Sequence, residues 1–269
     1  MSSSKTQQDE IPAESPSPKR RSWRVRWSMR AFLVLIALMA VGLGWISYHL
    51  RVGQLHESIA DKAANHGALI RWKLQRTEPV QMTMATGTTT SFFVTKKGGP
   101  DWMMRLGVEP VFQRMEAITF RQHSAKQLEA LLQDIEPLDR IKILSIDSVP
   151  VSESHIERLL DSLEIETLAI CNTSIGRRPM PCLRESRLTW LSFHRTQLSD
   201  VALDDLPETL THFDATRTRI TDDGLDKFVR LKSLKTLVLR RTPTSQAAIE
   251  KLQSEMPWCN IAWEPLKNP

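Results

Sequence analysis

Apolar side chains recur at a fixed period through the second half of the chain. Three segments align without gaps: LTWLSFHRTQLSDVALDDL (188–206), LTHFDATRTRITDDGLDKFVRL (210–231) and LKTLVLRRTPTSQAAIEKL (234–252). Each carries apolar residues at offsets 0, 3, 5, 15 and 18 from its first residue, and threonine at offset 8. The same frame fits residues 165–183, and it fits residues 141–159 with Val149 in place of the threonine. Because the starts lie 22 to 24 residues apart, the pattern predicts a stack of repeated structural units.

Two periodicities within each copy predict a strand followed by a short helix. Alternating apolar residues, such as Leu237 and Leu239, indicate a strand with one buried face. Apolar residues three apart, such as Leu225 and Phe228, indicate the buried stripe of a short helix. Two prolines interrupt this pattern in residues 176–183, which we therefore expect to be extended or a 3₁₀ turn.

The two ends of the array are atypical. MEAITF (115–120) opens a degenerate first copy, and WCNIAW (258–263) supplies a final strand with no helix after it. Terminal units of a stacked array must present a closed face to solvent, so irregular ends agree with this organisation.

The shared pattern LxxLxLxxTx(L/I)(T/S)DxxLxxL resembles the leucine-rich repeat, and most of all the short TDxGL repeats of ribonuclease-inhibitor-like proteins and of many bacterial surface proteins. The resemblance covers residues 115–269, with about six repeats. It implies an α/β fold, a right-handed solenoid with parallel strands on the concave side and short helices on the convex side. It also implies a protein that binds a partner through the concave face, is not an enzyme and needs no cofactor. Threonine stands where the family usually has asparagine, at Thr173, Thr196, Thr218 and Thr242.

The acidic pair Asp222-Asp223 before Gly224 has two interpretations, a calcium loop or the start of a helix. An EF-hand loop requires oxygen ligands at spaced positions that the neighbouring residues do not supply. Asp222 aligns with Asp200 and Ser245, which are good helix N-cap residues. We therefore predict a helix start and no metal site.

An uncharged run of eighteen residues, AFLVLIALMAVGLGWISY (31–48), predicts a transmembrane helix. Basic residues are concentrated before the run, so the positive-inside rule places the N-terminus in the cytoplasm and the repeats outside it, in the periplasm or extracellular space. A cleaved signal peptide and a buried core helix are the alternatives. Ala40 and Gly44 form a small-xxx-small pair through which two such helices could associate as a homodimer.

These observations predict four regions. Residues 1–28 form a disordered basic tail, 29–50 the membrane helix, 51–114 a juxtamembrane helix, loop and N-terminal cap, and 115–269 the solenoid. The basic stretch, the apolar anchor and a PDWMMRLG segment together are similar to a group of bacterial single-pass repeat proteins.

Within residues 51–114, the pattern predicts three features. A helix leaves the membrane, residues 68–74 form a strand, and residues 76–100 form a long, partly mobile loop. Apolar residues then pack over the open end of the solenoid, namely Trp102, Met103, Leu106 and Phe112.

The charge balance excludes little beyond nucleic-acid binding. The chain of 269 residues has a net charge of +5, of which the first 30 residues carry +4. The nearly neutral remainder gives no electrostatic reason to bind nucleic acid. Three cysteines (Cys171, Cys182 and Cys259) form no disulfide framework or metal spacing, and they leave the redox compartment open.

Candidate chemistry is confined to the residues expected on the concave face. The middle column of that face, Thr119, Ser145, Ala169, Ser192, Asp214, Val238 and Ala262, predicts a flat floor of small side chains. Beside it, Trp190 is a candidate anchor for a partner, and His194, His212 and Asp214 are either polar contacts or a metal or acid–base site. Arg195, Arg217 and Arg241, with Arg240 next to them, form either a grip for an acidic partner or a solvated edge.

The leading hypothesis is a membrane-anchored module that binds a protein or another surface ligand. A hydrolase or metal-dependent enzyme that uses the His/Asp group and a structural component of the envelope are the alternatives.

Overall fold

The computed structural model describes residues 28–83, 89–122 and 124–266. The chain divides into two compact units, residues 1–45 and 46–269. Helix α1 (Met29–Asn65) accounts for nearly all of the described part of the first unit and continues into the second. The predicted tail lies outside the described residues except for residue 28.

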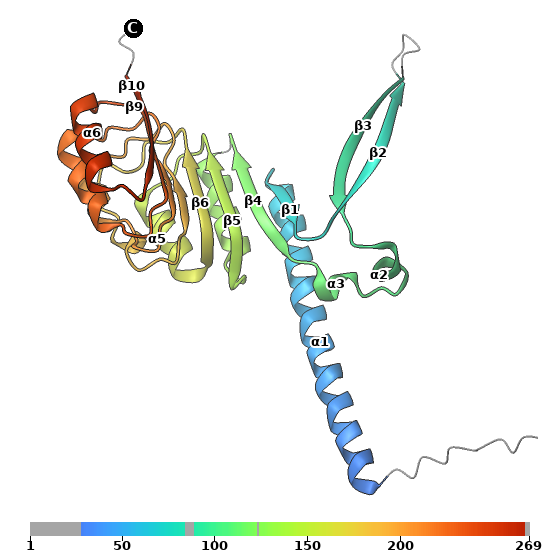
Figure 1. Cartoon of the computed structure of the whole chain (residues 1–269). Coiled ribbons are helices and arrows are strands. Elements are labelled where there is room, and N and C mark those ends of the chain that lie inside the picture. The colour runs from blue at the N-terminus through green and yellow to red at the C-terminus, as the bar shows by residue number, and fades with distance from the viewer. Residues whose placement is uncertain (1–27, 84–88, 123, 267–269) are drawn as a thin grey trace, which may run out of the picture. The chain divides into compact units, whose positions relative to one another are not determined.

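A single sheet organises the second unit. Among the described residues, its eight strands have the order β1-β4-β5-β6-β7-β8-β9-β10, in which β1 is antiparallel to β4 and the others run parallel (Figure 1). The strands are β1 (Leu69–Trp72), β4 (Met115–Arg121), β5 (Arg140–Asp147), β6 (Glu164–Cys171), β7 (Trp190–Ser192), β8 (His212–Asp214), β9 (Thr236–Thr242) and β10 (Asn260–Pro265). The predicted repeat strands and the strand within 68–74 are confirmed.

A helical segment follows each strand from β4 to β9. In chain order these are α4 (Ala125–Ile135), α5 (Glu153–Ser162), η1 (Pro181–Leu183), η2 (Asp200–Asp205), η3 (Asp222–Arg230) and α6 (Gln246–Glu255), where η marks a 3₁₀ helix. They form one layer on one side of the sheet (Figure 1). The predicted α/β architecture and the 3₁₀ turn within 176–183 are confirmed.

The core lies between the sheet and the helical layer. Each strand turns alternate apolar residues toward the helices, and these side chains are almost completely buried. Phe193 of one repeat contacts Phe213 of the next edge to face at 6.4 Å between ring centroids, and Phe213 is 5.8 Å from Phe228. Because each hydrophobic face is covered by the neighbouring repeat as well as by its own helix, one repeat alone could not bury it.

A residue with positive φ ends each repeat strand. These residues are Gln122, Ser148, Asn172, Arg195, Arg217 and Arg241, with φ between 55° and 58°. The backbone N–H of each of the first five donates to the carbonyl of the residue before the equivalent turn of the next repeat; for example, Arg217 N donates to Arg240 O at 2.8 Å. The left-handed conformation therefore turns the chain and directs one hydrogen bond into the neighbouring repeat.

The threonine that follows this turn closes it from inside. The hydroxyl groups of Thr196, Thr218 and Thr242 donate to the carbonyls of Phe193, Ala215 and Leu239 at 2.8–3.0 Å. Thr173 has the same position, but its buried hydroxyl has no hydrogen-bond partner among the described residues. At three of the four positions, the threonine hydroxyl therefore forms the hydrogen bond that closes the turn.

Because only one of these two hydroxyl groups is hydrogen-bonded, a threonine-to-valine substitution should have different effects at Thr218 and at Thr173. Thr218→Val leaves the Ala215 carbonyl without its donor in a buried site and should lower the free energy of unfolding by about 1–2 kcal/mol. Thr173→Val removes a hydroxyl that makes no bond, so stability should be unchanged or higher. Denaturant titration of the detergent-solubilised protein measures both. An equal loss in the two variants would contradict the assigned hydrogen bonds.

The acidic residues at the helix starts link repeats and do not cap their own helices. The N-cap residues are Ser199, Thr221 and Ser245, one position before the acidic residues in the first two cases. Asp200 Oδ1 accepts from Thr221 N at 2.9 Å, and Asp222 Oδ1 accepts from Ser245 N at 2.7 Å. The prediction of N-caps was wrong for both aspartates, whereas Ser245 is a cap whose hydroxyl accepts from Ala248 N.

Gly224 also has a role that the sequence did not reveal. A Cβ at this position would lie 2.2 Å from Asp200 Oδ1, so a side chain here would displace the carboxylate that binds Thr221. The glycine is required by close packing and not by a positive φ.

The segment between the anchor and the repeats differs most from expectation. The region predicted as a loop over 76–100 forms a hairpin of β2 (Gln75–Thr83) and β3 (Thr89–Lys97), paired antiparallel. Two short helices follow, α2 (Asp101–Arg105) and α3 (Glu109–Phe112). Of the four residues predicted to pack over the solenoid, only Met103 is buried; Trp102, Leu106 and Phe112 are 57%, 69% and 44% exposed, so the predicted packing of these three residues was wrong.

The first repeat is covered instead by α1 and β1. Ile59, Ala60 and Ala63 of α1 belong to the same buried cluster as β4 and α4. His66 Nε2 lies 3.0 Å from Asp134 Oδ2 of α4, which fixes the end of the helix against the first repeat. At Gly53, a Cβ would lie 1.9 Å from the carbonyl oxygen of Pro110, so only glycine allows α3 to approach α1 this closely.

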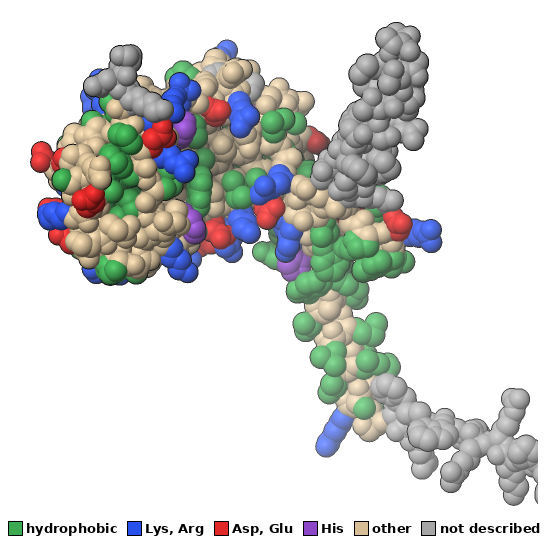
Figure 2. Space-filling model, turned by 45° about the horizontal axis from the view of Figure 1, so that its top comes forward, with side chains coloured by type: hydrophobic (Ala, Val, Ile, Leu, Met, Phe, Trp, Pro, Cys, Tyr) green, Lys and Arg blue, Asp and Glu red, His purple; other side chains and the backbone are tan. Residues whose placement is uncertain are grey.

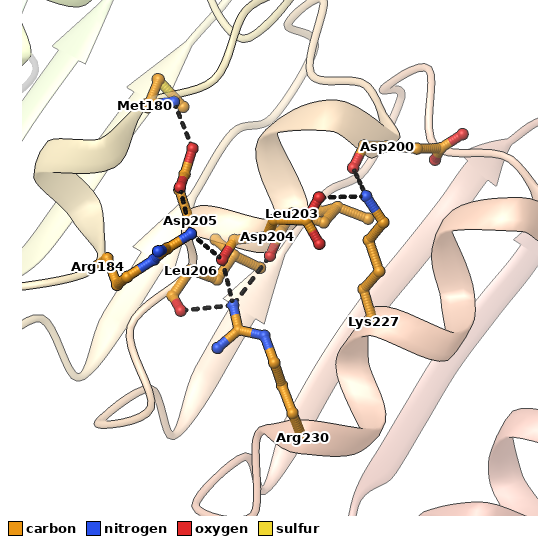
Figure 3. Close-up of polar contacts among 9 residues, drawn as sticks. All are labelled: Met180, Arg184, Asp200, Leu203, Asp204, Asp205, Leu206, Lys227 and Arg230. Atoms are coloured by element: carbon orange, nitrogen blue, oxygen red, sulfur yellow. Dashed lines mark hydrogen bonds and ion pairs between the residues drawn. The ribbon is translucent and has the colours of Figure 1, made fainter.

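Polar contacts join the 3₁₀ segments on the helical side (Figure 3). The Arg230 guanidinium donates to the carbonyls of Leu203, Asp204 and Leu206 at 2.7–3.1 Å and so satisfies the end of η2. The buried Asp205 carboxylate accepts from Met180 N and from Arg184. The backbone carbonyls at the end of η2 are thereby kept hydrogen-bonded.

Candidate interaction surface

The side of the sheet away from the helices carries the candidate residues. The strand register aligns Thr119, Ser145, Ala169, Ser192, Asp214, Val238 and Ala262 across neighbouring strands. This is the column that the repeat frame predicted. Its members are small or medium-sized, so the middle of the face is a broad floor on which larger side chains stand out.

Trp190 is the largest side chain of this face. It begins β7, where it pairs with Thr167 on one side and His212 on the other. It is half-buried, and its indole is flanked by two polar residues and not by the apolar core. An aromatic residue in this setting offers apolar area for a partner while its neighbours supply hydrogen-bonding groups.

Two of the three polar candidates on the face, His212 and Asp214, contact threonines that lie close to them in the chain. Asp214 aligns with Ser192, and His194 follows two residues later, beyond the end of β7. Asp214 Oδ1 accepts from Thr216 N and Oγ1 at 2.9 and 2.6 Å, and His212 Nδ1 lies 2.9 Å from Thr211 Oγ1. Across the described ranges, no group of three or more His, Cys, Asp or Glu side chains could hold a metal ion. The alternative of an acid–base site that uses His194, His212 and Asp214 stays a hypothesis.

The arginine row lies along the turns at the edge of this face. Arg195, Arg217 and Arg241 are the positive-φ residues of three successive repeats, and Arg240 is exposed beside the last. Arg241 is paired with Glu264 at 3.4 Å, so its charge is partly compensated. The row therefore has a backbone role that is independent of its charge, because any residue at these positions must adopt the left-handed turn.

Substitutions of Arg217 separate the backbone role from the charge. Arg217→Asn should leave the free energy of unfolding unchanged or raise it by up to about 1 kcal/mol, because asparagine tolerates positive φ better than most residues. Arg217→Val should lower it by about 1–3 kcal/mol, since a β-branched residue is strained there. Arg219→Val, two residues on and without positive φ, is the matched control and should lose little. Equal effects of Asn and Val at 217, measured by denaturant titration, would contradict the constraint.

A cleft at the first repeat was missed by sequence reasoning. It has a volume of about 550 Å³ and is lined by α1, the start of β4, and the loop and strand around β5. Its wall carries basic and acidic side chains in nearly equal numbers, namely Lys73, Arg114, Arg140 and Lys142 with Glu116, Asp139 and Glu166. These residues come from distant segments without a common motif, so no sequence signal could have grouped them.

His56 is the perturbed group of this cleft. Its Nδ1 accepts from Met115 N at 3.2 Å, and the side chain is buried. Burial, followed by the positive charge of Arg114, lowers the pKa of His56 from 6.5 to about 4, although Asp139 opposes the shift. The imidazole is therefore neutral at physiological pH and serves as a hydrogen-bond acceptor that holds β4 to α1.

The lowered pKa predicts a loss of stability in mild acid. Between pH 6.5 and about 4 the unfolded chain binds a proton at His56 that the folded chain does not. The stabilisation that comes from neutral His56 is therefore fully present above pH 6.5 and is lost as the pH falls toward about 4. The full loss from this group is about 3 kcal/mol. His56→Asn keeps an acceptor for Met115 N but cannot titrate, so its unfolding free energy should fall less between pH 7 and pH 4.5. Parallel pH profiles for the two proteins would contradict this assignment.

The three cysteines are free thiols and not activated nucleophiles. Cys171 and Cys182 are half-buried and Cys259 is buried. Burial raises the pKa of all three, that of Cys182 to about 11, and nearby carboxylates such as Asp147 raise that of Cys171 further. The thiols are therefore protonated at neutral pH.

Comparison with known proteins adds one structural likeness. No protein-family model matches the chain, and no curated protein matches it. Among solved structures, the crystal structure of an internalin from Listeria monocytogenes is similar, with a TM-score of 0.37 and 15% sequence identity. The match covers 54% of this chain and 46% of the internalin chain, so this chain spans about half of that protein. The description of the fold rests on the repeat and on the observed strand pairing.

Proposed function

We propose that this chain is a single-pass membrane protein whose repeat domain binds a protein or another surface ligand through the uncovered face of the sheet. The observation that carries the proposal is that face itself, a broad floor of small side chains with the half-buried Trp190 above it. A large partner can lie across such a floor, and a rigid aromatic residue supplies a localised contact of high energy.

The rigidity of the face favours binding over catalysis. Each strand from β4 to β9 is bonded to both neighbours and the turns are fixed by hydrogen bonds to the next repeat, so little conformational freedom remains to be lost when a partner binds. We expect the crossovers between parallel strands to have the usual right-handed sense, which would make this face the concave side of a solenoid.

Membrane anchoring is supported by α1. It is long and apolar enough to cross a membrane by length and composition, and none of its most apolar 18-residue window, of mean hydropathy 2.2, is buried. An exposed helix of this composition does not suit a soluble core. Together with the basic residues before it, α1 favours a cytoplasmic N-terminus and an extracytoplasmic repeat domain. Dimerisation through Ala40 and Gly44 remains a separate hypothesis.

A paired substitution tests the face. Trp190→Ala with Arg217→Glu, in the full-length protein, should reduce the recovery of a crosslinked partner by at least about tenfold, since it removes an aromatic anchor and reverses a charge of the edge row. The readout is affinity capture from crosslinked native membranes with quantitative mass spectrometry.

The matched control removes the same kinds of group elsewhere. Trp258 is 41% exposed outside the sheet face, and Lys232 Nζ lies 4.5 Å from the centre of its ring. Trp258→Ala with Lys232→Glu should leave recovery unchanged. If both double variants capture the same partners as the unaltered protein, the sheet face is not the binding site.

A further inference from the structure

The short helices α2 and α3 expose apolar side chains that the repeat domain does not use. Trp102 is 57% exposed and Leu106 is 69% exposed, although both lie beside the buried Met103. Met104 and Phe112 are also exposed, by 47% and 44%. Figure 2 shows hydrophobic side chains gathered in this part of the unit, and a concentration of this kind marks an interaction surface.

The position of this surface is fixed by contacts with α1. Arg114, two residues after α3, donates to His49 Nδ1 at 2.8 Å, and the carbonyl of Pro110 in α3 lies against Gly53. Leu106 precedes Pro110 by four residues, which limits its distance to about 14 Å. The exposed residues are therefore tied to α1 close to residues 49–53.

These contacts occur at the height where a bilayer changes from hydrocarbon to headgroups. The uncharged run of α1 ends at Tyr48. Gly53 lies five residues later, about 7.5 Å further along the helix axis. The headgroup region is roughly 5–8 Å thick on each side of the hydrocarbon core. If the run spans the membrane, as proposed above, α3 contacts α1 within that layer.

We propose that the segment of α2 and α3 inserts Trp102 and Leu106 into the phospholipid interface. This inference rests on the proposed membrane anchoring. Tryptophan and leucine suit this depth because indole favours the headgroup boundary and the aliphatic chain reaches the hydrocarbon below it. The two helices carry Asp101, Arg105 and Glu109, a net charge of −1, so insertion is driven by apolar burial and not by anionic lipid.

Quenching of tryptophan by brominated phospholipids tests the proposal in the full chain, reconstituted in phosphatidylcholine vesicles. The chain has eight tryptophans. Trp102→Phe should lower the quenched emission by about one-eighth of the total, because one lipid-exposed indole is lost. Trp258→Phe, which removes an indole outside the surface, should raise the quenched fraction. Leu106→Trp in the Trp102→Phe background should restore the quenching, and added phosphatidylglycerol should change none of these results.

Trp45→Phe separates this proposal from the anchor on which it rests. Trp45 lies within the uncharged run, so its loss should also lower quenching if α1 spans the bilayer. If Trp45→Phe lowers quenching and Trp102→Phe does not, the membrane anchor is supported and the proposed insertion of Trp102 is wrong. That is the result expected if a protein, and not lipid, covers this surface. If neither lowers it, the anchor itself is wrong. Circular dichroism of each variant verifies that the repeats remain folded.

Discussion

The hydrogen bond that each strand-ending residue sends into the next repeat is the constraint on which the rest of this structure depends. Only a residue with positive φ can turn the chain there and still aim its N–H at the following strand, and six successive turns adopt this conformation. The bond sets the register between repeats. The register in turn places Phe193 against Phe213 and aligns Trp190 with His212 on the other face. The left-handed turn costs energy at a non-glycine residue, and the array is stable because the stacked hydrophobic faces offset that cost.

The second half of α1 is part of this array and not a stalk attached to it. Ile59, Ala60 and Ala63 lie in the same buried cluster as the first repeat, and β1 pairs with the strand that would otherwise be an exposed edge. The end strand on this side of the sheet is therefore β1, which has only four residues, and short end strands give other chains little edge to pair with. The contacts at His56, Gly53 and Asp134 then connect the helix to three separate elements.

The sequence predicted the array because its signal is periodic and repeated, so that errors in one copy are corrected by the others. It failed where a feature occurs once or depends on contacts between copies. The β2–β3 hairpin has no repeated frame, and threonines and a proline within it suggested a loop. Asp200 and Asp222 have the composition of N-caps, but their carboxylates bond to the next repeat, which only the stacking brings within reach. Trp102 and Leu106 were expected to be buried because apolar residues usually are, yet short helices near α1 leave them exposed.

The candidate face shows the same division between what a sequence specifies and what it does not. The residues of each column were predictable, since offset and register follow from the period. Their chemistry was not: Arg217 has a backbone requirement that its side chain does not indicate, and the register aligns Asp214 with Ser192 and not with His194. The face that this register builds is continuous across neighbouring strands. The same face can cover a large area of a macromolecule without rearrangement, so the rigidity that the turns impose is itself the physical argument for recognition of a large partner.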